Sequence, residues 1–250
     1  MPAMDYARIA DLYDSYVQVT DDISFFVSYV QNGITVLDLM SGTGRVSVPL
    51  AQHGAKVTCV DSSPEMLAYL AQKAYELDLS IDIVYSDIAE LSLEETFDLI
   101  LLPLNSFAEI TESEGQELAL AAIRRHLTAG GKFICTLHNP FVRLQTVGQG
   151  LKLRGKFGEP NRTILLWAEE DYDPATQLVS GMQFVEVYDA AGVLIEKRFV
   201  ELAFYLHNPI SFESMLERAG FSVSTKFGDY QRAPFNPETS PFVIWELESL

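Results

Sequence analysis

Short apolar runs rich in β-branched residues recur along the first 137 residues, and segments with helical periodicity separate most of them. A strand that is apolar at nearly every position is buried on both faces, as in a parallel sheet that helices cover on both sides. Two further runs follow a helical segment near residue 215. This pattern predicts an α/β fold with a doubly wound, mostly parallel, seven-stranded sheet. The expected strands span residues 34–39, 56–61, 81–85, 97–102, 132–137, 221–227 and 242–247.

Local signals mark where some of the helices begin and end. Ser63 offers a hydroxyl cap, Pro64 has the backbone angle of a first helical turn, and Glu65 adds an acid there. Together these three residues predict a helix start. Gly54 and Gly220 follow helical segments at the position where a left-handed residue commonly ends a helix.

The alternation of strands and helices stops after residue 139. Between residues 163 and 207, three long runs of β-type composition are joined by the turn signals Asp173-Pro174 and Ala190-Ala191-Gly192. Many of their positions alternate between apolar and polar, which is typical of antiparallel strands. We therefore expect three parts: an N-terminal helical segment at 1–33, an α/β core at 34–139 and 208–250, and an antiparallel β insertion at 140–207.

Charge and composition argue against several classes of protein. The chain has 17 basic and 35 acidic residues, a net charge of −18, so its surface repels the phosphates of nucleic acids. No apolar stretch approaches the ~18 residues of a membrane-spanning helix, and the first five residues lack the basic start of a signal peptide. Cys59 and Cys135 lie in apolar runs and are expected to be buried thiols. We expect a cytoplasmic protein with no nucleic-acid, membrane or metal partner.

The ends of the first two expected strands carry residues that suit a nucleotide-type ligand. In an open parallel sheet, ligands bind at the carboxyl ends of the strands. Asp38, Gly42 and Gly44 follow the first strand, and Asp61 ends the second. Glycines let the backbone lie against a ligand, and a carboxylate at the second end can accept both hydroxyls of a ribose. These residues leave the ligand open between a dinucleotide and S-adenosylmethionine.

Two details favour S-adenosylmethionine. A dinucleotide fingerprint has glycines at the spacing GxGxxG, and its third glycine falls on Ser47. Asp38 precedes the loop, and an acid there suits a ligand with an ammonium group better than one with a pyrophosphate. The alternative role of Asp38 is to brace the loop by accepting backbone amides.

Five segments in order resemble the motifs of class I S-adenosylmethionine-dependent methyltransferases. Met40 and Ser41 depart from the glycine and cysteine that are common in the first of these motifs. The resemblance implies that the α/β core binds S-adenosylmethionine. The segments are 36–45, 60–67, 85–88, 97–107 and 127–133.

The resemblance also implies a role for each matching position. Asp61 holds the ribose, while Ser62 and Met66 lie against the sugar and the adenine. Asp87 accepts a hydrogen bond from the adenine amino group, and the backbone amide of Ile88 meets the ring. The end of the fourth strand, which includes Leu104, borders the methionine part of the cofactor. The glycine-loop positions in this cofactor set are Asp38, Gly42 and Gly44.

The implied activity is methyl transfer to a nitrogen or oxygen of a small-molecule acceptor. His138 follows the fifth expected strand, which places it at the mouth of the cofactor cleft as a candidate catalytic base or acceptor ligand. Its alternative is a hydrogen-bonded residue at a strand end. A protein that binds the cofactor or its demethylated product without catalysis is the second hypothesis. A nicotinamide-dependent oxidoreductase is the third, and the missing third glycine disfavours it.

Tyr6, Tyr13 and Tyr16 share one face of an expected N-terminal helix. The simpler interpretation is a helix packed on the sheet by its aromatic face. Residues 6–14 also resemble the opening of small-molecule methyltransferases, including amino-sugar N-methyltransferases, whose tyrosines border both ligands. Tyr13 is then a cofactor-binding residue and 1–33 a lid. The same subgroup carries a β insertion that usually roofs the acceptor site, so we expect 140–207 there.

Residues 143–162 hold five of the 17 bases against one acid, together with four glycines. We expect a mobile loop. It is either a solvated connector or a segment that closes over an acceptor bearing a carboxylate or phosphate. The five bases are Arg143, Lys152, Arg154, Lys156 and Arg162.

Overall fold

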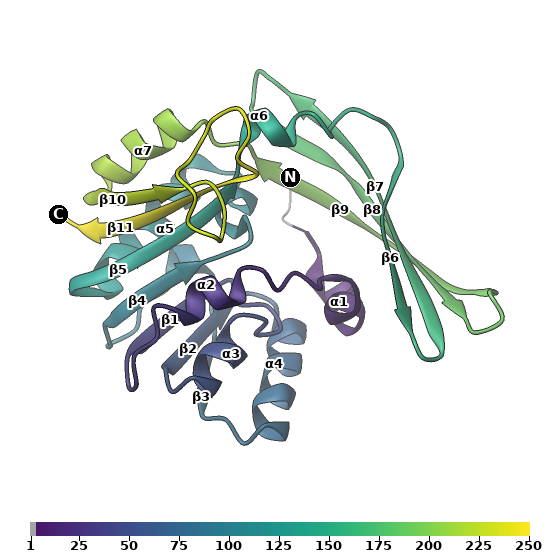
Figure 1. Cartoon of the computed structure of the whole chain (residues 1–250), viewed down its shortest axis with the longest axis horizontal. Coiled ribbons are helices and arrows are strands. Elements are labelled where there is room, and N and C mark those ends of the chain that lie inside the picture. Colours follow the sequence, from purple (N-terminus) through teal and green to yellow (C-terminus); the bar gives the residue numbers. More distant parts are fainter. Residues whose placement is uncertain (1–3) are drawn as a thin grey trace.

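The computed structural model describes residues 4–250, which form two β-sheets with helices around the larger one (Figure 1). The larger sheet has seven strands in the order β10-β11-β5-β4-β1-β2-β3, and β11 runs antiparallel to its two neighbours. The predicted doubly wound, mostly parallel seven-stranded sheet is therefore confirmed. The strands are β1 Thr35–Leu39, β2 Lys56–Asp61, β3 Ile81–Tyr85, β4 Phe97–Leu102, β5 Leu127–His138, β10 Phe221–Phe227 and β11 Phe242–Ser249.

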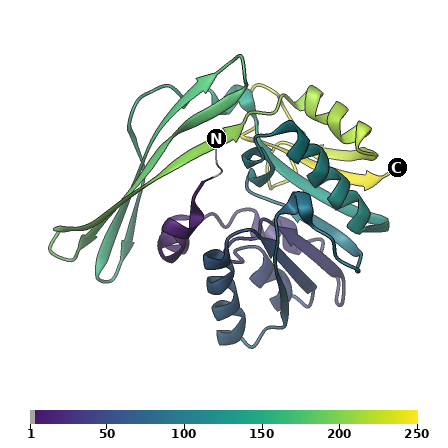
Figure 2. The ribbon, with the colours of Figure 1, turned by 180° about the vertical axis from the view of Figure 1, so that it is seen from behind.

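Helices cover both faces of this sheet. The central strands are apolar at nearly every position because both of their faces are buried. Along β4, Leu99 and Leu101 are buried on one face while Ile100 and Leu102 are buried on the other. Helices α2, α3 and α4 pack on the first face, and α5 and α7 pack on the second. Figure 2 shows α5 lying across the face that is turned away in Figure 1. The helices are α2 Ile23–Val27, α3 Ser47–Gln52, α4 Pro64–Glu76, α5 Ser113–His126 and α7 Pro209–Arg218.

The residues predicted to begin and end helices show the expected hydrogen bond and backbone angles. The Ser63 hydroxyl accepts the backbone N–H of Met66 at 3.3 Å, and Pro64 is the first residue of α4. Gly54 and Gly220 have φ of +90° and +88° just past α3 and α7. A residue with a Cβ is strained in this left-handed region, which is why glycine ends both helices.

The second sheet is antiparallel, with the strand order β6-β7-β8-β9, and it projects from the side where the parallel strands end (Figure 1). The three predicted strands are present, and the predicted antiparallel insertion is confirmed. A fourth strand, β6, occupies part of the segment for which we expected a mobile loop, so that expectation is wrong for residues 152–159. The short helix α6, Pro140–Arg143, leads into this sheet. The strands are β6 Lys152–Glu159, β7 Arg162–Asp173, β8 Leu178–Asp189 and β9 Leu194–Tyr205.

The first part of the N-terminal segment lies between the two sheets (Figure 1) and contains a 3-10 turn, η1 Tyr6–Arg8, and the helix α1 Ala10–Tyr16, whereas its later helix α2 packs on the core sheet. The apolar residues Ile9, Leu12 and Tyr16 of the first part pack on the inserted sheet rather than on the core sheet. The first three residues of the predicted lid lie outside the described residues. That the segment acts as a lid stays a prediction.

Within residues 4–250, no helix is long and apolar enough to cross a membrane. In the same range, no group of three or more His, Cys, Asp and Glu side chains is arranged to hold a metal ion. Cys59 and Cys135 are buried free thiols, as predicted.

A buried ion pair joins the N-terminal segment to the glycine loop. Asp22 is fully buried, and the two terminal nitrogens of Arg45 donate to its two oxygens at 2.7 Å each. Removing one partner of such a pair leaves an uncompensated charge inside the protein.

Arg45→Met should therefore lower the free energy of unfolding by about 3–5 kcal/mol in urea denaturation. The matched control is Arg8→Met, which breaks the exposed pair with Asp5 and should change stability by about 0.5 kcal/mol or less. Equal losses in the two variants would show that the Asp22–Arg45 pair does not hold this junction. The double variant Asp22→Asn with Arg45→Met should recover much of the loss.

Candidate cofactor and acceptor site

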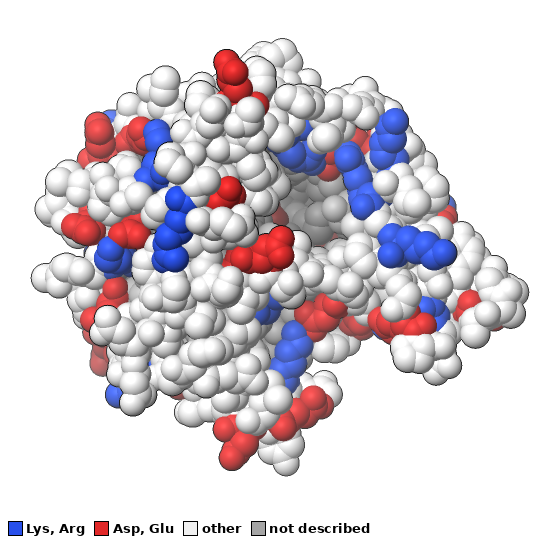
Figure 3. All heavy atoms as spheres, viewed as in Figure 1, with Lys and Arg blue, Asp and Glu red and all other residues white. Residues whose placement is uncertain are grey.

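A cavity of about 260 Å³ lies at the carboxyl ends of β1, β2 and β4, beneath the N-terminal segment. The strand order reverses between β1 and β4, and this switch point is where open α/β sheets bind ligands. On the face seen in Figure 3, the surface is hollowed between the core and the inserted sheet. The residues that line the cavity include Tyr6, Tyr13, Met40, Gly42, Asp61, Ser62, Met66, Leu104, Ser106 and Glu109.

The loop after β1 turns through three residues with left-handed backbone. Gly42 and Gly44 have φ of +57° and +80°, and Met40 has φ of +52°. Met40 thus keeps the conformation for which glycine is favoured, at the position where the sequence departs from the first motif. A Cβ on Gly42 would meet nothing within 4 Å, whereas a Cβ on Gly44 would lie 2.2 Å from Leu70 Cδ1. Gly42 therefore keeps space open at the cavity, and Gly44 permits close packing of the loop on α4.

Asp61 ends β2 with its carboxylate at the cavity. Its Oδ2 accepts the backbone N–H of Gly42 at 2.7 Å, and its Oδ1 accepts that of Ser63 at 2.8 Å. Burial raises the pKa of Asp61, and these backbone hydrogen bonds oppose the rise. Each carboxylate oxygen can accept more than one hydrogen bond, so both retain capacity for a ligand hydroxyl. Ser62 and Met66 line the same cavity.

Asp38 is buried at the end of β1 and lines a smaller adjoining cavity with Gly42 and Leu104. Its Oδ2 accepts the hydroxyl of Ser47, and its Oδ1 has no hydrogen-bond partner among residues 4–250. Burial raises the pKa of Asp38 to about 7. No backbone amide of that range donates to it, so the alternative role as a loop brace finds no support. A buried carboxylate oxygen without a partner suits the ammonium group of S-adenosylmethionine.

The loop after β4 borders both cavities. Leu104 and Asn105 have φ of +54° and +66°, which is strained for residues with a Cβ. Asn105 stabilises this turn through neighbouring β5, since its N–H donates to the Thr136 carbonyl and its Oδ1 accepts the N–H of His138. Leu104 consequently stands at the cavity wall.

Two tyrosines of the N-terminal segment line the larger cavity. Tyr6 and Tyr13 line the cavity and meet edge to face at 6.0 Å. Asp14, next to Tyr13, accepts the hydroxyl of Thr43 in the glycine loop at 2.6 Å and pairs with Lys73 of α4 at 2.5 Å. These contacts place Tyr13 beside the predicted cofactor residues. Its cofactor-binding role stays a prediction, as do the roles of the other cavity residues.

Three predicted site residues lie elsewhere. Asp87 caps a 3-10 turn, η2 Ile88–Glu90, by accepting the backbone N–H of Ala89 at 2.8 Å, and Ile88 is buried in the core. His138 is stacked on Phe242, with ring centroids 5.7 Å apart. Burial, and then the charge of Arg143, lower the pKa of His138 to about 4. The adenine-binding and catalytic roles of these residues stay predictions, and none of them lines the two cavities.

The sequence interpretation missed one acid of the cavity, Glu109. It ends a 3-10 turn, η3 Ser106–Glu109, and its Oε1 accepts the hydroxyl of Tyr6 at 2.6 Å. Burial raises the pKa of Glu109 to about 7. Its one sequence signal is position: it lies just beyond the segment 97–107 that borders the predicted methionine site.

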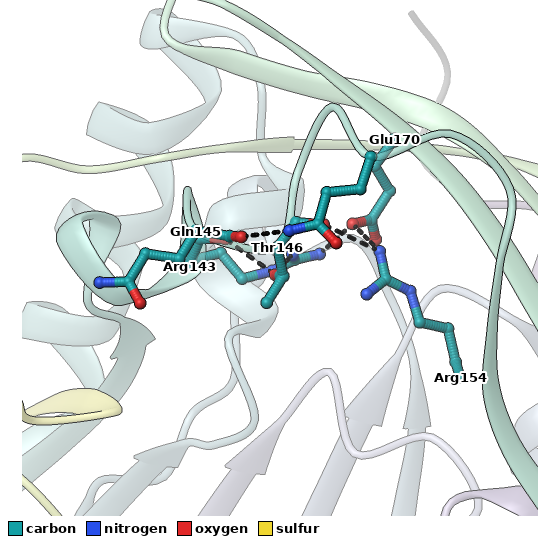
Figure 4. Close-up of polar contacts among 6 residues, drawn as sticks. Arg143, Gln145, Thr146, Arg154 and Glu170 are labelled. Carbon is teal, nitrogen blue, oxygen red and sulfur yellow. Dashed lines mark hydrogen bonds and ion pairs between the residues drawn. The ribbon is translucent and has the colours of Figure 1, made fainter.

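The basic segment is largely paired within the protein (Figure 4). Arg143 and Arg154 donate to the same oxygen of Glu170 in β7, at 2.6 Å and 2.8 Å, and Glu170 is 6% exposed. Lys156 precedes Phe157, whose ring faces Tyr16 of α1, so strand alternation turns Lys156 to the opposite face of the sheet. The network ties α6 and β6 to β7. An anionic acceptor would have to compete with Glu170 for these guanidinium groups.

Comparison with known proteins agrees with this geometry. Residues 36–131 match the family described as "Methyltransferase domain". The chain is 28% identical over 213 residues to a protein named cypemycin N-terminal methyltransferase from Streptomyces sp., which covers 85% of this chain and 82% of that protein.

Solved methyltransferase structures have the same fold. The CcbJ methyltransferase from Streptomyces caelestis superposes with a TM-score of 0.79 at 25% identity, over 97% of this chain and 96% of that one. An S-adenosylmethionine-dependent methyltransferase from Clostridium acetobutylicum ATCC 824 also gives 0.79, at 20% identity over 98% of both chains. The recognition of a class I methyltransferase fold with an inserted antiparallel sheet is confirmed. The oxidoreductase hypothesis is set aside.

Asp61→Ala should weaken the binding of S-adenosylhomocysteine at least tenfold in titration calorimetry. Hydrogen bonds to a charged group are worth about 1.5–3 kcal/mol, and about 1.4 kcal/mol is a factor of ten. Asp82→Ala, at an exposed position on neighbouring β3, is the control and should bind as the wild type does. Unchanged affinity in a folded Asp61→Ala protein would remove Asp61 from the cofactor site.

Gly44→Ala should mainly lower the stability of the protein, whereas Gly42→Ala should mainly weaken cofactor binding. Gly44→Ala forces a Cβ into buried Leu70 and should cost about 2–4 kcal/mol of stability. Gly42→Ala meets open space and should cost about 1 kcal/mol, yet it should weaken cofactor binding because that space belongs to the cavity. Denaturation and calorimetry measure both effects. The reverse order of stabilities would contradict the packing described for Gly44.

Proposed function

We propose that this chain, which is an S-adenosylmethionine-dependent methyltransferase, transfers a methyl group to a nitrogen or oxygen of a small-molecule acceptor. The observation that carries the proposal is one cavity in which strand-end residues and N-terminal tyrosines meet. Gly42, Asp61 and Leu104 come from the ends of three strands, and Tyr6 and Tyr13 close over them.

The cavity residues fit the cofactor by their chemistry. Asp61 offers acceptors to ribose hydroxyls, and the unpartnered oxygen of Asp38 offers one to an ammonium group. Bound S-adenosylmethionine supplies an electrophilic methyl group. The chain has to exclude water and hold the acceptor atom in line with that methyl, about 3 Å away. The tyrosines and the inserted sheet are the elements that would do this.

The named relative favours an acceptor with a nitrogen. The cypemycin relative is named for methylation of an N-terminus, which presents a nitrogen. We propose the predicted division of the chain on the same basis, with 140–207 as a roof over the acceptor.

The test is product formation with S-adenosylmethionine and a panel of small amines and alcohols. We expect S-adenosylhomocysteine to appear together with an acceptor that has gained one methyl group, both detected by mass spectrometry. Asp61→Ala is the negative control. Binding of the cofactor without product from any acceptor would favour the alternative, a protein that binds without catalysis.

A further inference from the structure

The proposed function leaves open how the acceptor loses its proton, and one side chain of the cavity is placed to take it. Glu109 follows the loop at the end of β4 and lines the cavity with Leu104 and Ser106 of that loop. Tyr6 and Asp61 line the same cavity from the N-terminal segment and from β2. Glu109 is therefore in the chamber where the cofactor and acceptor are proposed to meet.

One oxygen of the Glu109 carboxylate accepts a hydrogen bond, and the other is free within the described residues. The hydroxyl of Tyr6 donates to Oε1 at 2.6 Å, across 103 residues of sequence. Burial first, and then the charge of Glu109, raise the pKa of Tyr6 well above its usual value, so this hydroxyl remains the donor. Within residues 4–250, no hydrogen bond or ion pair reaches Oε2 of Glu109.

The described lining of the cavity is acidic. It contains four carboxylates and no lysine, arginine or histidine. A cleft lined by one sign of charge concentrates ligands of the other sign. Cations are therefore favoured in this cavity over neutral alcohols. The four are Asp5, Asp61, Glu65 and Glu109.

We propose that Glu109 removes the proton from an acceptor amine that enters the cavity as its ammonium form, and that Tyr6 positions the Glu109 carboxylate for this transfer. The inference rests on the proposed function and narrows its acceptor to an amine. Glu109 is the catalytic residue in this scheme, and Tyr6 is a positioning residue.

The step balances. An ammonium nitrogen has no lone pair, so its N–H bond must break first, and the proton passes to Oε2 of Glu109. The freed lone pair forms the new N–C bond while the methyl–sulfur bond breaks and its electron pair stays on sulfur. The methylated amine leaves as a cation, and Glu109 then releases its proton to solvent. No oxidant, reductant or further reactant is needed.

The surroundings of Glu109 suit a base at neutral pH. Burial raises its pKa to about 7, the Tyr6 hydrogen bond lowers it, and the charge of Asp61 raises it. Tyr13 of α1 is the other titratable group that faces it from a packed element. A base works best with a pKa near the working pH. His138 is less suitable, because its pKa is about 4 and it does not line the cavity.

The first test is the pH profile of kcat/KM for Glu109→Gln with an amine from the panel. At pH 7 we expect a loss of roughly 100-fold or more, the usual contribution of a general base. The wild-type rate should level off once Glu109 is ionised, at or below about pH 7 because the positive charge of the cofactor lowers its pKa. The variant rate should keep rising tenfold per pH unit towards the amine's own pKa. A fluorinated amine that is already neutral at pH 7 should restore much of the variant's rate. A profile identical to the wild type would overturn the inference.

The second test is Tyr6→Phe. Loss of this hydrogen bond raises the pKa of Glu109, so the acid limb of the kcat/KM profile should move to higher pH. Tyr29→Phe is a matched control, because it removes a tyrosine–glutamate hydrogen bond of 2.7 Å, to Glu246, away from the cavity. Its profile should stay in place. An unshifted profile in Tyr6→Phe would rule out Tyr6 as the positioning residue.

A third measurement does not depend on turnover. The amine is titrated into the enzyme–S-adenosylhomocysteine complex at pH 6 in two buffers of different ionisation heat. Glu109 is then mostly protonated, and an ammonium ion that pairs with it should displace about one proton per site. Glu109→Gln should bind S-adenosylhomocysteine as the wild type does and release no proton. No release from the wild type would contradict the inference.

The acceptor panel distinguishes failure of the role proposed for Glu109 from failure of the proposed function. Methylation of alcohols alone would sustain the proposed function and overturn the role of Glu109 as a base for amines. An absence of product from every acceptor would overturn the proposed function itself.

Discussion

The cavity depends on carboxylates that are held out of water without a cationic partner. Asp38 and Glu109 both have a pKa of about 7 because burial disfavours their charged forms. Asp61 has a raised pKa for the same reason. The protein supports them with backbone N–H and hydroxyl donors, from Gly42 and Tyr6 among others, and places no basic side chain in the described lining of the larger cavity. Arg45 borders the smaller cavity, where its charge opposes the rise in the pKa of Asp38. The resulting deficit of positive charge is what a cationic ligand would fill.

Two buried carboxylates outside the cavity are paired with arginine side chains. Asp22 receives both nitrogens of Arg45, and Glu170 receives Arg143 and Arg154. These pairs lie where separate parts of the chain join: the N-terminal segment with the glycine loop, and α6 and β6 with β7. Ion pairs therefore position the elements around the cavity, while Asp61 and Glu109 inside it have no basic partner within residues 4–250. The carboxylates that we propose to be functional therefore differ from the structural ones in having no basic partner.

The sequence is sufficient for the features that depend on local pattern. Strands β2 and β4 have the predicted bounds because buried parallel strands are apolar along most of their length. The edge strand β3 also has the predicted bounds, although it is only partly buried. β6 was missed because its glycines and charged residues obscure the strand pattern, although it pairs with the next strand, β7, in a tight hairpin. Glu109 was missed for a related reason. Its burial and its bond to Tyr6 arise only when a segment 103 residues away folds over it. The strand-end position of His138 was clear, whereas its stacking on Phe242 depends on β11.

The shared electrostatics couple the two ligands of the proposed reaction. A positive charge within a few ångströms favours the ionised form of a carboxylate and lowers its pKa. S-adenosylmethionine carries a sulfonium, an ammonium and a carboxylate, and this net cation would enter a cavity where Asp61 raises the pKa of Glu109. In the proposed complex the sulfonium charge would offset that of Asp61 and favour the ionised form of Glu109. Because coupling between two ligands is reciprocal, an amine that pairs with Glu109 would in turn affect the affinity for the cofactor. An acidic cavity with few internal counter-charges is the physical basis of that coupling.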